Sequence, residues 1–212
     1  MIVRVWQRAM MAGVGPAVVA AGEKEIVDAV KAAGGEAVLT DPELPSGSDR
    51  IHAALQAIDR AGRYDAVINL QGDLPELDPG AVKVVASLLN DSRADIATLA
   101  APIDNETDFD NPNVVKPVVA WQGGRGRALY FTRTRAPSGE GPLYHHIGIY
   151  AFTRDALTRF VALPPSPLER REKLEQLRAL EAGFSIWVAR VDRVPLSVDT
   201  PADLERARKL IA

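Results

Sequence analysis

Short apolar runs alternate with amphipathic segments of helical length through the first half of the chain, and this alternation constrains the fold most. Each run is short enough to be a strand buried on both faces, and each intervening segment is long enough for a crossover helix. This order predicts an α/β protein with a mixed but mostly parallel sheet and helices on both of its faces. The expected strands are residues 16–21, 36–40, 66–70 and 95–101, and the expected helices are residues 1–12, 23–33, 49–61 and 79–90.

The chain opens on a helix with no strand in front of it. Ile2, Val5 and Ala9 fall on one helical face, and Gly13 is suited to end the helix. Doubly wound nucleotide-binding units usually begin with a strand and a phosphate loop before the first helix. The opening helix is therefore irregular for this fold class.

The pattern changes after Pro102 to alternating strands and close turns. We expect one domain over residues 1–212, with a β-rich insertion near residues 103–150 that forms a homodimer contact. The elements expected in this half are strands at 113–120, 127–132, 145–152 and 184–191, a helix at 167–182, and a closing helix with Thr200 as N-cap and Pro201 at its first position.

Composition excludes several classes of protein. The 212 residues are 47% hydrophobic and 25% charged, which is ordinary for a globular protein. The net charge of -3 argues against a nucleic-acid surface, and no apolar run is long enough to span a membrane. The absence of cysteine excludes disulfides and thiolate chemistry, and the expected location is the cytoplasm.

A carboxylate follows the expected strand at residues 66–70. Gln71, Gly72 and Asp73 make the pattern abruptly polar there. Ligands of open α/β sheets bind outside the carboxyl ends of strands, and a glycine lets a ligand approach the backbone. Asp73 is therefore a candidate ligand of a divalent metal ion, and the alternative is that it merely caps the next turn.

A second carboxylate, Asp199, lies at the end of another apolar segment and directly before a helix. It is either an ordinary acid stabilised by the helix dipole or a second metal ligand. Mg²⁺ takes one or two protein carboxylates and completes its shell with water and phosphate oxygens. Asp73 and Asp199 are therefore candidate catalytic residues and Mg²⁺ ligands.

Three further groups have both a functional and a structural interpretation. The loop from Ser46 to Arg50 either caps a helix, with Ser48 as N-cap, or binds a nucleotide through its hydroxyls, amides and guanidinium. His146 and Tyr150 share a strand face while His145 points the other way, which argues against a two-histidine metal site. The expected helix at 167–182 carries a solvated or polyol-binding face formed by Glu172, Glu175 and Gln176.

Eight short motifs occur in an order that resembles the 3-deoxy-manno-octulosonate (Kdo) cytidylyltransferases, the CMP-Kdo synthetases of lipopolysaccharide biosynthesis. Each motif is weak alone, but the ordered set covers essentially the whole chain. The motifs are Ser46-Gly-Ser-Asp-Arg50, Gln71-Gly-Asp-x-Pro75, Asn111-Pro-Asn-Val-Val-Lys116, Ala128-Leu-Tyr-Phe-Thr-Arg133, His146-x-Gly-x-Tyr150, Ser166-Pro-Leu-Glu169, Leu174-Glu-Gln-Leu-Arg178 and Val198-Asp-Thr-Pro-x-Asp-Leu204.

The resemblance implies a Rossmann-like nucleotide-diphospho-sugar transferase fold and an Mg²⁺-dependent transfer of CMP from CTP to Kdo. Asp73 and Asp199 would hold Mg²⁺. The residues implied in CTP binding are Ser46, Gly47, Ser48, Arg50 and Gln71. The residues implied in Kdo binding are Arg133, whose partner would be the carboxylate, and His146, Tyr150, Glu175 and Gln176.

The sequence departs from this family at its start. Members begin with a strand and a basic, glycine-containing loop that grips the triphosphate, and the first residues here resemble the helix that follows that loop. We therefore expect the first strand and phosphate loop to be absent. The alternatives are a truncated relative that only binds ligand or dimerises, and another nucleotidyltransferase, such as a CMP-sialic acid synthetase or a nucleotide-sugar pyrophosphorylase.

Overall fold

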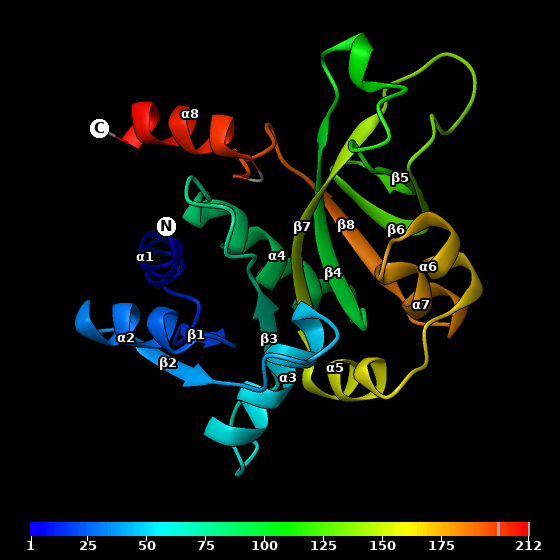
Figure 1. Ribbon diagram of the computed structural model, residues 1–212. Helices are drawn as coiled ribbons and strands as arrows, with labels where there is room; N and C mark the ends of the chain where they lie inside the picture. Colours follow the sequence, from blue (N-terminus) through cyan, green and yellow to red (C-terminus); the bar gives the residue numbers. More distant parts are fainter. Residues whose placement is uncertain (199, 212) are drawn as a thin grey trace. The chain divides into compact units, whose positions relative to one another are not determined.

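The computed structural model describes residues 1–198 and 200–211, and the chain divides into two compact units (Figure 1). The first unit comprises Met1–Asp65, Asn69–Lys83 and Pro195–Ala212. The second unit comprises Ala66–Ile68 and Val84–Val194. Within the described residues, no helix combines the length and the apolar character needed to cross a membrane.

The first unit is built on a parallel pair of short strands, β1 (Val18–Ala21) and β2 (Glu36–Leu39). The helix α2 (Lys24–Ala32) is the crossover between them, and α3 (Gly47–Ile58) contacts both strands. An antiparallel hairpin needs no such helix, whereas a parallel pair does. The expected alternation of strands and helices is confirmed in this part of the chain.

The opening helix, α1 (Ile2–Ala12), is present as expected and contacts α2. It ends at Gly13, which adopts the left-handed conformation with φ of 64° and donates its N–H to the Met10 carbonyl at 3.1 Å. Glycine adopts this conformation without the steric cost of a Cβ atom, so the helix ends where the sequence indicated.

Two later helices begin with proline, as the sequence predicted. α4 (Pro79–Ser92) follows Asp78, whose Oδ1 accepts the Gly80 N–H at 2.8 Å. α8 (Pro201–Ile211) follows a reciprocal cap in which the Asp203 N–H donates to Thr200 Oγ1 at 3.2 Å and the Thr200 N–H donates to Asp203 Oδ2 at 3.0 Å. These bonds satisfy amide donors that a helix leaves unpaired at its start.

The second unit contains a six-stranded sheet in the order β3-β7-β4-β8-β6-β5. The interior strand β4 has residues 96–101 buried, which explains its uninterrupted apolar sequence. The strands are β3 (Ala66–Asn69), β4 (Ile96–Pro102), β5 (Lys116–Gln122), β6 (Arg125–Thr132), β7 (Tyr144–Thr153) and β8 (Ile186–Arg190).

The expectation of a mostly parallel sheet is wrong for this unit. β4 runs parallel to β8 but antiparallel to β7, and β6 runs antiparallel to both β8 and β5. The alternation of strands and helices in the first half of the chain predicts parallel neighbouring strands. The two neighbours of β4, however, are β7 and β8, which both come from the second half of the chain. The sheet is therefore mixed and largely antiparallel.

The β5–β6 hairpin depends on a close backbone approach at Gly126. This residue pairs with Trp121, and a Cβ atom placed on it would clash with the Ala120 carbonyl oxygen and lie 2.8 Å from Trp121 Cα. We expect Gly126→Ala to lower the free energy of unfolding by about 1–3 kcal/mol, because backbone must move to admit the methyl group. Gly124→Ala is the matched control, since nothing lies within 4 Å of the added atom. Equal urea midpoints for the two variants would contradict this explanation.

The helix expected at residues 167–182 is instead two short helices, α6 (Pro167–Glu172) and α7 (Gln176–Glu181). Lys173 ends α6 in the left-handed conformation, with φ of 55°. Glu172 and Gln176 therefore do not lie one turn apart on a single helix. The sequence shows no glycine or proline at the break, which is why the expected helix ran through it.

The helix α5 (Arg154–Val161) was not anticipated from the sequence. Thr153 caps it by accepting the Ala156 N–H at 3.1 Å, and Ala156, Leu157 and Phe160 are its buried residues. An N-cap threonine before apolar residues at this spacing is a helix-start signal. The short helix η1 (Glu106–Asp108) was likewise not anticipated.

Candidate active site

The loop from Ser46 to Arg50 begins α3 in the first unit. Ser46, rather than the expected Ser48, is the N-cap, because Ser46 Oγ accepts the Asp49 N–H at 3.2 Å. Ser48 instead is buried in the first turn of the helix. The N-cap therefore lies two residues before the expected position, and Gly47 and Ser48 belong to the first turn of the helix, where backbone N–H groups have no partner within the helix.

Arg50 fixes the loop that precedes α3. Its guanidinium donates to Thr40 Oγ1 at 2.7 Å, to the Asp41 carbonyl at 3.1 Å and to the Pro42 carbonyl at 3.3 Å. These bonds bind the end of β2 to the helix. The structure therefore gives Arg50 a structural role, in addition to the nucleotide-binding role implied by the family resemblance.

Gln71 and the start of α3 lie close together within the first unit. A Cβ atom placed on Gly47 would lie 3.8 Å from Gln71 Nε2 and 4.0 Å from Asn69 Nδ2. A glycine at this position leaves the backbone accessible beside two amide side chains. The structure thus brings together residues that the sequence analysis assigned to one nucleotide-binding group.

Asp73 is bonded to the segment that leads to Asp199. The Val198 N–H donates to the Asp73 carbonyl at 2.9 Å, and Ser197 Oγ donates to Asp73 Oδ2 at 3.3 Å. Asp73 Oδ1 is buried. Asp199 lies outside the described residues, so the predicted carboxylate pair stays a prediction.

The donor set at Asp73 fits a hard divalent cation by its chemistry. Mg²⁺ prefers oxygen ligands and needs only one or two carboxylates from the protein. The part of the chain that the structure describes contains no group of three or more His, Asp or Glu side chains suited to a metal ion. Mg²⁺ completes its coordination shell with water and phosphate oxygens where the protein supplies one or two carboxylates.

The residues after Asp73 are clamped by the opening helix. Arg4 donates from Nε to the Pro75 carbonyl at 3.1 Å and from NH2 to Glu76 Oε1 at 2.7 Å. Arg8 NH2 lies 4.0 Å from Glu76 Oε2. α1 therefore holds the turn that carries Asp73, a role that the sequence analysis did not assign to these arginines.

His146 and Tyr150 lie together on β7 in the second unit, as predicted from the strand period. Their ring centroids are 5.4 Å apart, and Phe131 packs edge-on against His146 at 5.1 Å. His146 Nε2 lies 3.0 Å from Thr98 Oγ1. Thr98 also donates toward the Ile147 and Ile149 carbonyls, at 3.2 and 2.8 Å, where β7 is irregular against β4.

Burial keeps His146 uncharged. It lowers the pKa of the imidazole from 6.5 to about 3, with a smaller contribution from His145. Tyr150 is affected in the same way, because burial and then the Glu175 carboxylate raise the pKa of its phenol. Both side chains are therefore neutral hydrogen-bonding groups near pH 7.

The low pKa of His146 predicts a pH-dependent stability. Between its folded value of about 3 and its ordinary value of 6.5, the unfolded chain binds more protons, so this contribution is complete above that window and is lost as pH falls through it. The loss approaches about 1.4 kcal/mol per pH unit for a single group. We expect His146→Gln to lack this part of the acid destabilisation. Urea unfolding of both proteins at about pH 4 and about pH 7 measures the difference, and identical pH dependence would refute it.

Arg133 fixes the break between α6 and α7. Its guanidinium donates to the carbonyls of Glu172 at 2.8 Å, Pro112 at 2.9 Å and Lys173 at 3.2 Å. The Glu172 carboxylate in turn accepts the Arg133 N–H at 3.0 Å. The left-handed Lys173 is thereby held by a residue that directly follows β6.

Glu175 and Gln176 lie at the start of α7, and Gln176 is buried. The electrostatic influence of Glu175 on Tyr150 places these two side chains in one neighbourhood. The second unit thus holds His146 and Tyr150 in contact on β7, and Glu175 and Gln176 at the start of α7, with Arg133 holding the segment before α7. Thr98 and Arg178 also contact members of this group, although the sequence assigns no role to either: Thr98 lies in an apolar strand, and Arg178 ends the motif that contains Glu175 and Gln176.

The structure thus places polar, hydrogen-bonding side chains on β7 and α7 of the second unit. In the first unit it places Gln71 beside Gly47 and a carboxylate, Asp73, in the following turn. The family model described as "Cytidylyltransferase" matches residues 1–186. The chain belongs to the cytidylyltransferase family.

Its relatives within that family share one activity in their names. The chain is 64% identical to the 3-deoxy-manno-octulosonate cytidylyltransferase of Parvibaculum lavamentivorans, over 100% of this chain and 83% of that protein. It is 57% identical to the enzyme of the same name from Paramagnetospirillum magneticum, over 100% of this chain and 87% of that protein. The resemblance found in the sequence motifs is therefore confirmed.

A solved structure has the same fold. It is described as CMP:2-keto-3-deoxy-manno-octonic acid synthetase complexed with CTP, and it is 36% identical to this chain. The similarity has a TM-score of 0.91 and covers 99% of this chain and 86% of the other. The α/β fold predicted from the sequence is thus that of a known sugar-acid nucleotidyltransferase.

Proposed function

We propose that this chain transfers CMP from CTP to 3-deoxy-D-manno-octulosonate, giving CMP-Kdo and pyrophosphate for lipopolysaccharide biosynthesis. The observation that carries the proposal is 64% identity over the whole chain to a 3-deoxy-manno-octulosonate cytidylyltransferase. The anomeric hydroxyl oxygen of the sugar acid forms a bond to the α-phosphorus and loses its proton. The bond from that phosphorus to the bridging oxygen breaks, and pyrophosphate leaves.

The first unit supplies the nucleotide group in this proposal. Ser46, Gly47, Ser48 and Gln71 bind the cytosine and ribose of CTP through hydroxyl, amide and backbone groups. The close approach of Gly47 to Gln71 supports this assignment. Arg50 orders the adjoining loop and presents its remaining N–H donors to the nucleotide.

Asp73 and Asp199 are the residues that would hold Mg²⁺ in this proposal. The bond from Val198 to Asp73 supports their pairing, because Asp199 is the next residue along the chain. Bound Mg²⁺ neutralises phosphate charge and acidifies a coordinated hydroxyl. Transfer of this kind needs mainly orientation and charge neutralisation, so no protein nucleophile is required.

The second unit supplies the sugar-acid group. Neutral His146 and Tyr150, together with Glu175 and Gln176, bind the sugar hydroxyls, since acceptors and donors of this kind satisfy vicinal hydroxyl groups. Arg133 is assigned to the sugar carboxylate. Three of its donors already bind backbone carbonyls, so its remaining N–H donors would make that contact.

Release of pyrophosphate by the purified chain with CTP, Kdo and Mg²⁺ tests the proposal. We expect release to require all three components and to match the formation of CMP-Kdo mole for mole. A panel that replaces Kdo with sialic acid, or CTP with the other nucleoside triphosphates, separates this activity from those of other nucleotidyltransferases. Binding of CTP or Kdo without turnover would instead support the binding-only alternative.

We also propose a cytoplasmic homodimer whose contact lies in residues 103–150. β5, which belongs to this segment, is an edge strand of the six-stranded sheet, and Leu129 on β6 is 51% exposed. An exposed edge and an exposed leucine are features that a second chain would cover. Light scattering of the purified protein measures the mass, and a monomer at micromolar concentration would refute the dimer.

A further inference from the structure

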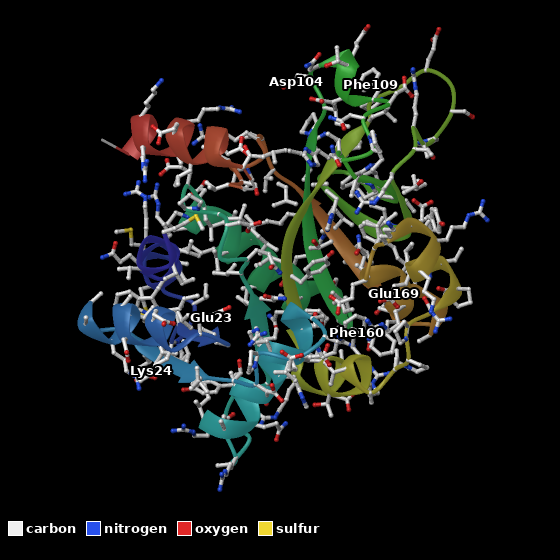
Figure 2. The ribbon with its side chains drawn as sticks, in the orientation of Figure 1. Glu23, Lys24, Asp104, Phe109, Phe160 and Glu169 are labelled. Atoms are coloured by element: carbon white, nitrogen blue, oxygen red, sulfur yellow. The ribbon has the colours of Figure 1, made fainter. Side chains whose placement is uncertain are left out.

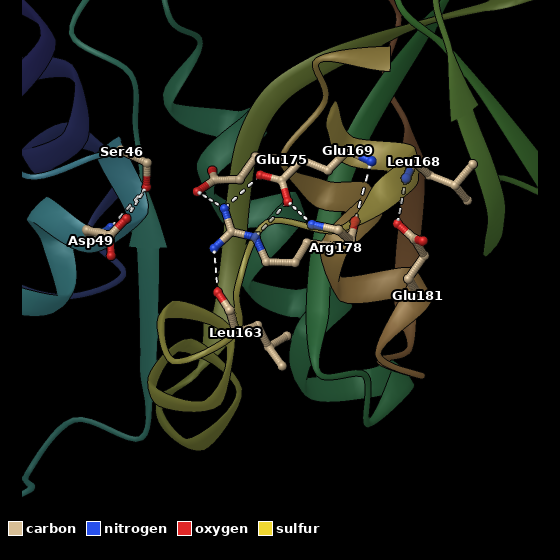
Figure 3. Close-up of polar contacts among 9 residues, drawn as sticks. Ser46, Asp49, Leu163, Leu168, Glu169, Glu175, Arg178 and Glu181 are labelled. Carbon is tan, nitrogen blue, oxygen red and sulfur yellow. Dashed lines mark hydrogen bonds and ion pairs between the residues drawn. The ribbon is translucent and has the colours of Figure 1, made fainter. Parts of the chain in front are cut away.

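Arg178 lies on the buried side of α7, three residues after Glu175. Its side chain is 10% exposed, which is unusual for an arginine and requires compensation by several partners. Figure 3 shows its guanidinium between two carboxylates, with its bonds drawn as dashed lines. The established sequence motifs assign no function to this side chain.

Glu169 is the first partner. Its two carboxylate oxygens accept from Arg178 NH2 at 2.7 Å and from Nε at 2.9 Å, a bidentate pair of the strongest kind. The same carboxylate accepts the Ser166 N–H at 2.9 Å in the capping box of α6. Burial alone would raise the pKa of Glu169, but these bonds outweigh it and hold the pKa below its ordinary value. The pair is therefore ionised and rigid.

Two contacts from α5 and its end complete the environment. Arg178 NH1 donates to the Leu163 carbonyl at 3.2 Å. The guanidinium also lies 4.8 Å from the centroid of the Phe160 ring, a cation–π contact. Phe160 and Glu169, which come from different helices, are both labelled in Figure 2. The guanidinium is thus fixed from three helices of the same unit.

Glu175 faces this fixed charge with one oxygen. Glu175 Oε1 lies 3.6 Å from Arg178 NH2 and is buried, while the side chain as a whole is 34% exposed. The exposed part therefore belongs to the other atoms of the side chain. Oε1 thus faces the arginine, and the exposed surface of the side chain lies on its remaining atoms.

We propose that Arg178 is a positioning residue for the sugar-acid site, and that it acts by orienting the carboxylate of Glu175. This inference rests on the proposed function, in which Glu175 accepts hydrogen bonds from sugar hydroxyls. The Glu169 pair sets the place of the guanidinium, and the guanidinium sets the rotamer of Glu175. Arg178 itself needs no contact with the substrate.

Arg178→Lys is the informative substitution, because lysine keeps the charge but lacks the planar fork that binds Glu169 and Glu175 together. We expect the dissociation constant of Kdo, measured by calorimetry, and the KM for Kdo to rise roughly 10- to 100-fold, as misplacement of a binding group does. The KM for CTP is expected to stay within about twofold. A merely structural role would reduce the folded fraction and leave both KM values unchanged.

A double-mutant cycle with Glu175→Gln identifies the route of the effect. If Arg178 acts through Glu175, Arg178→Lys changes Kdo affinity much less in the Glu175→Gln background than in the unaltered chain. Additive effects of the two substitutions would overturn the inference. So would an unchanged Kdo affinity in Arg178→Lys alone.

Arg159→Lys is the matched control. Arg159 also pairs with two acids, Asp95 and Asp155, and its guanidinium lies 4.4 Å from the Phe184 ring centroid. We expect its substitution to leave Kdo affinity unchanged. If the unaltered chain binds Kdo but does not turn it over, the proposed function is refuted. The double-mutant cycle, measured by the dissociation constants of Kdo, then still tests whether Arg178 orients Glu175. A chain that neither binds nor turns over Kdo would overturn both.

Discussion

Asp73→Asn is expected to reduce CMP-Kdo formation by at least about 10²-fold while the fold stays intact. Asparagine keeps the size of the side chain and its oxygen can still accept from Ser197, whose hydroxyl lies 3.3 Å from Asp73 Oδ2. It removes the negative charge that a divalent cation requires among its ligands. The initial rate of pyrophosphate release at several Mg²⁺ concentrations measures the effect, and circular dichroism confirms folding.

Asp78→Asn is the control for this substitution. Asp78 is exposed and accepts the Gly80 N–H at the start of α4, a bond that asparagine also makes. We expect this variant to retain full activity and an unchanged Mg²⁺ requirement. Near-normal turnover in Asp73→Asn would refute the assignment of Asp73 to the metal.

Phe160→Ala is expected to lower the free energy of unfolding by about 3–5 kcal/mol. The ring is 2% exposed, and its centroid lies 5.8 Å from that of Phe152 and 4.8 Å from the Arg178 guanidinium. Its removal leaves a cavity between α5 and β7 and also removes the cation–π contact. Urea unfolding, with a common slope for both proteins, measures the change.

Thr158→Ala, on the exposed side of the same helix, is the comparison for Phe160→Ala. Thr158 Oγ1 donates to the Arg154 carbonyl one turn earlier, and this exposed bond contributes little. We expect a change within about 0.5 kcal/mol. A loss of similar size in both variants would mean that the helix, and not the buried ring, determines the stability of this region.

Local chemistry made the helices of the first unit predictable. Gly13 ends α1 because glycine adopts the left-handed conformation without steric cost, and Pro79 and Pro201 begin their helices because proline fixes a helical φ. The N-cap at Ser46 was less predictable, since Ser46, Ser48 and Asp49 all suit an N-cap and only the folded loop selects one of them.

Contacts between distant residues account for the errors. The left-handed Lys173 is held by Arg133, which lies 40 positions earlier, so no nearby residue announces the break between α6 and α7. The antiparallel pairing of β7 with β4 likewise joins strands that are far apart in the sequence, so local patterns do not predict it. The residues of the candidate site were found through family motifs. Arg178 ends one of these motifs, but its pairing with Glu169 joins two different helices, α6 and α7, so helical spacing does not indicate it.

The hydroxyl of Thr98 determines the tautomer of His146. A hydroxyl has one proton to donate, and the Ile149 carbonyl at 2.8 Å is its nearest backbone acceptor. Thr98 Oγ1 therefore accepts a hydrogen bond from His146 Nε2, 3.0 Å away, and the neutral ring carries its hydrogen on that nitrogen. Nδ1 is then the nitrogen without hydrogen, so in the proposed sugar-acid site His146 would act as an acceptor and not as a donor, and one threonine on β4 sets the polarity of the ring.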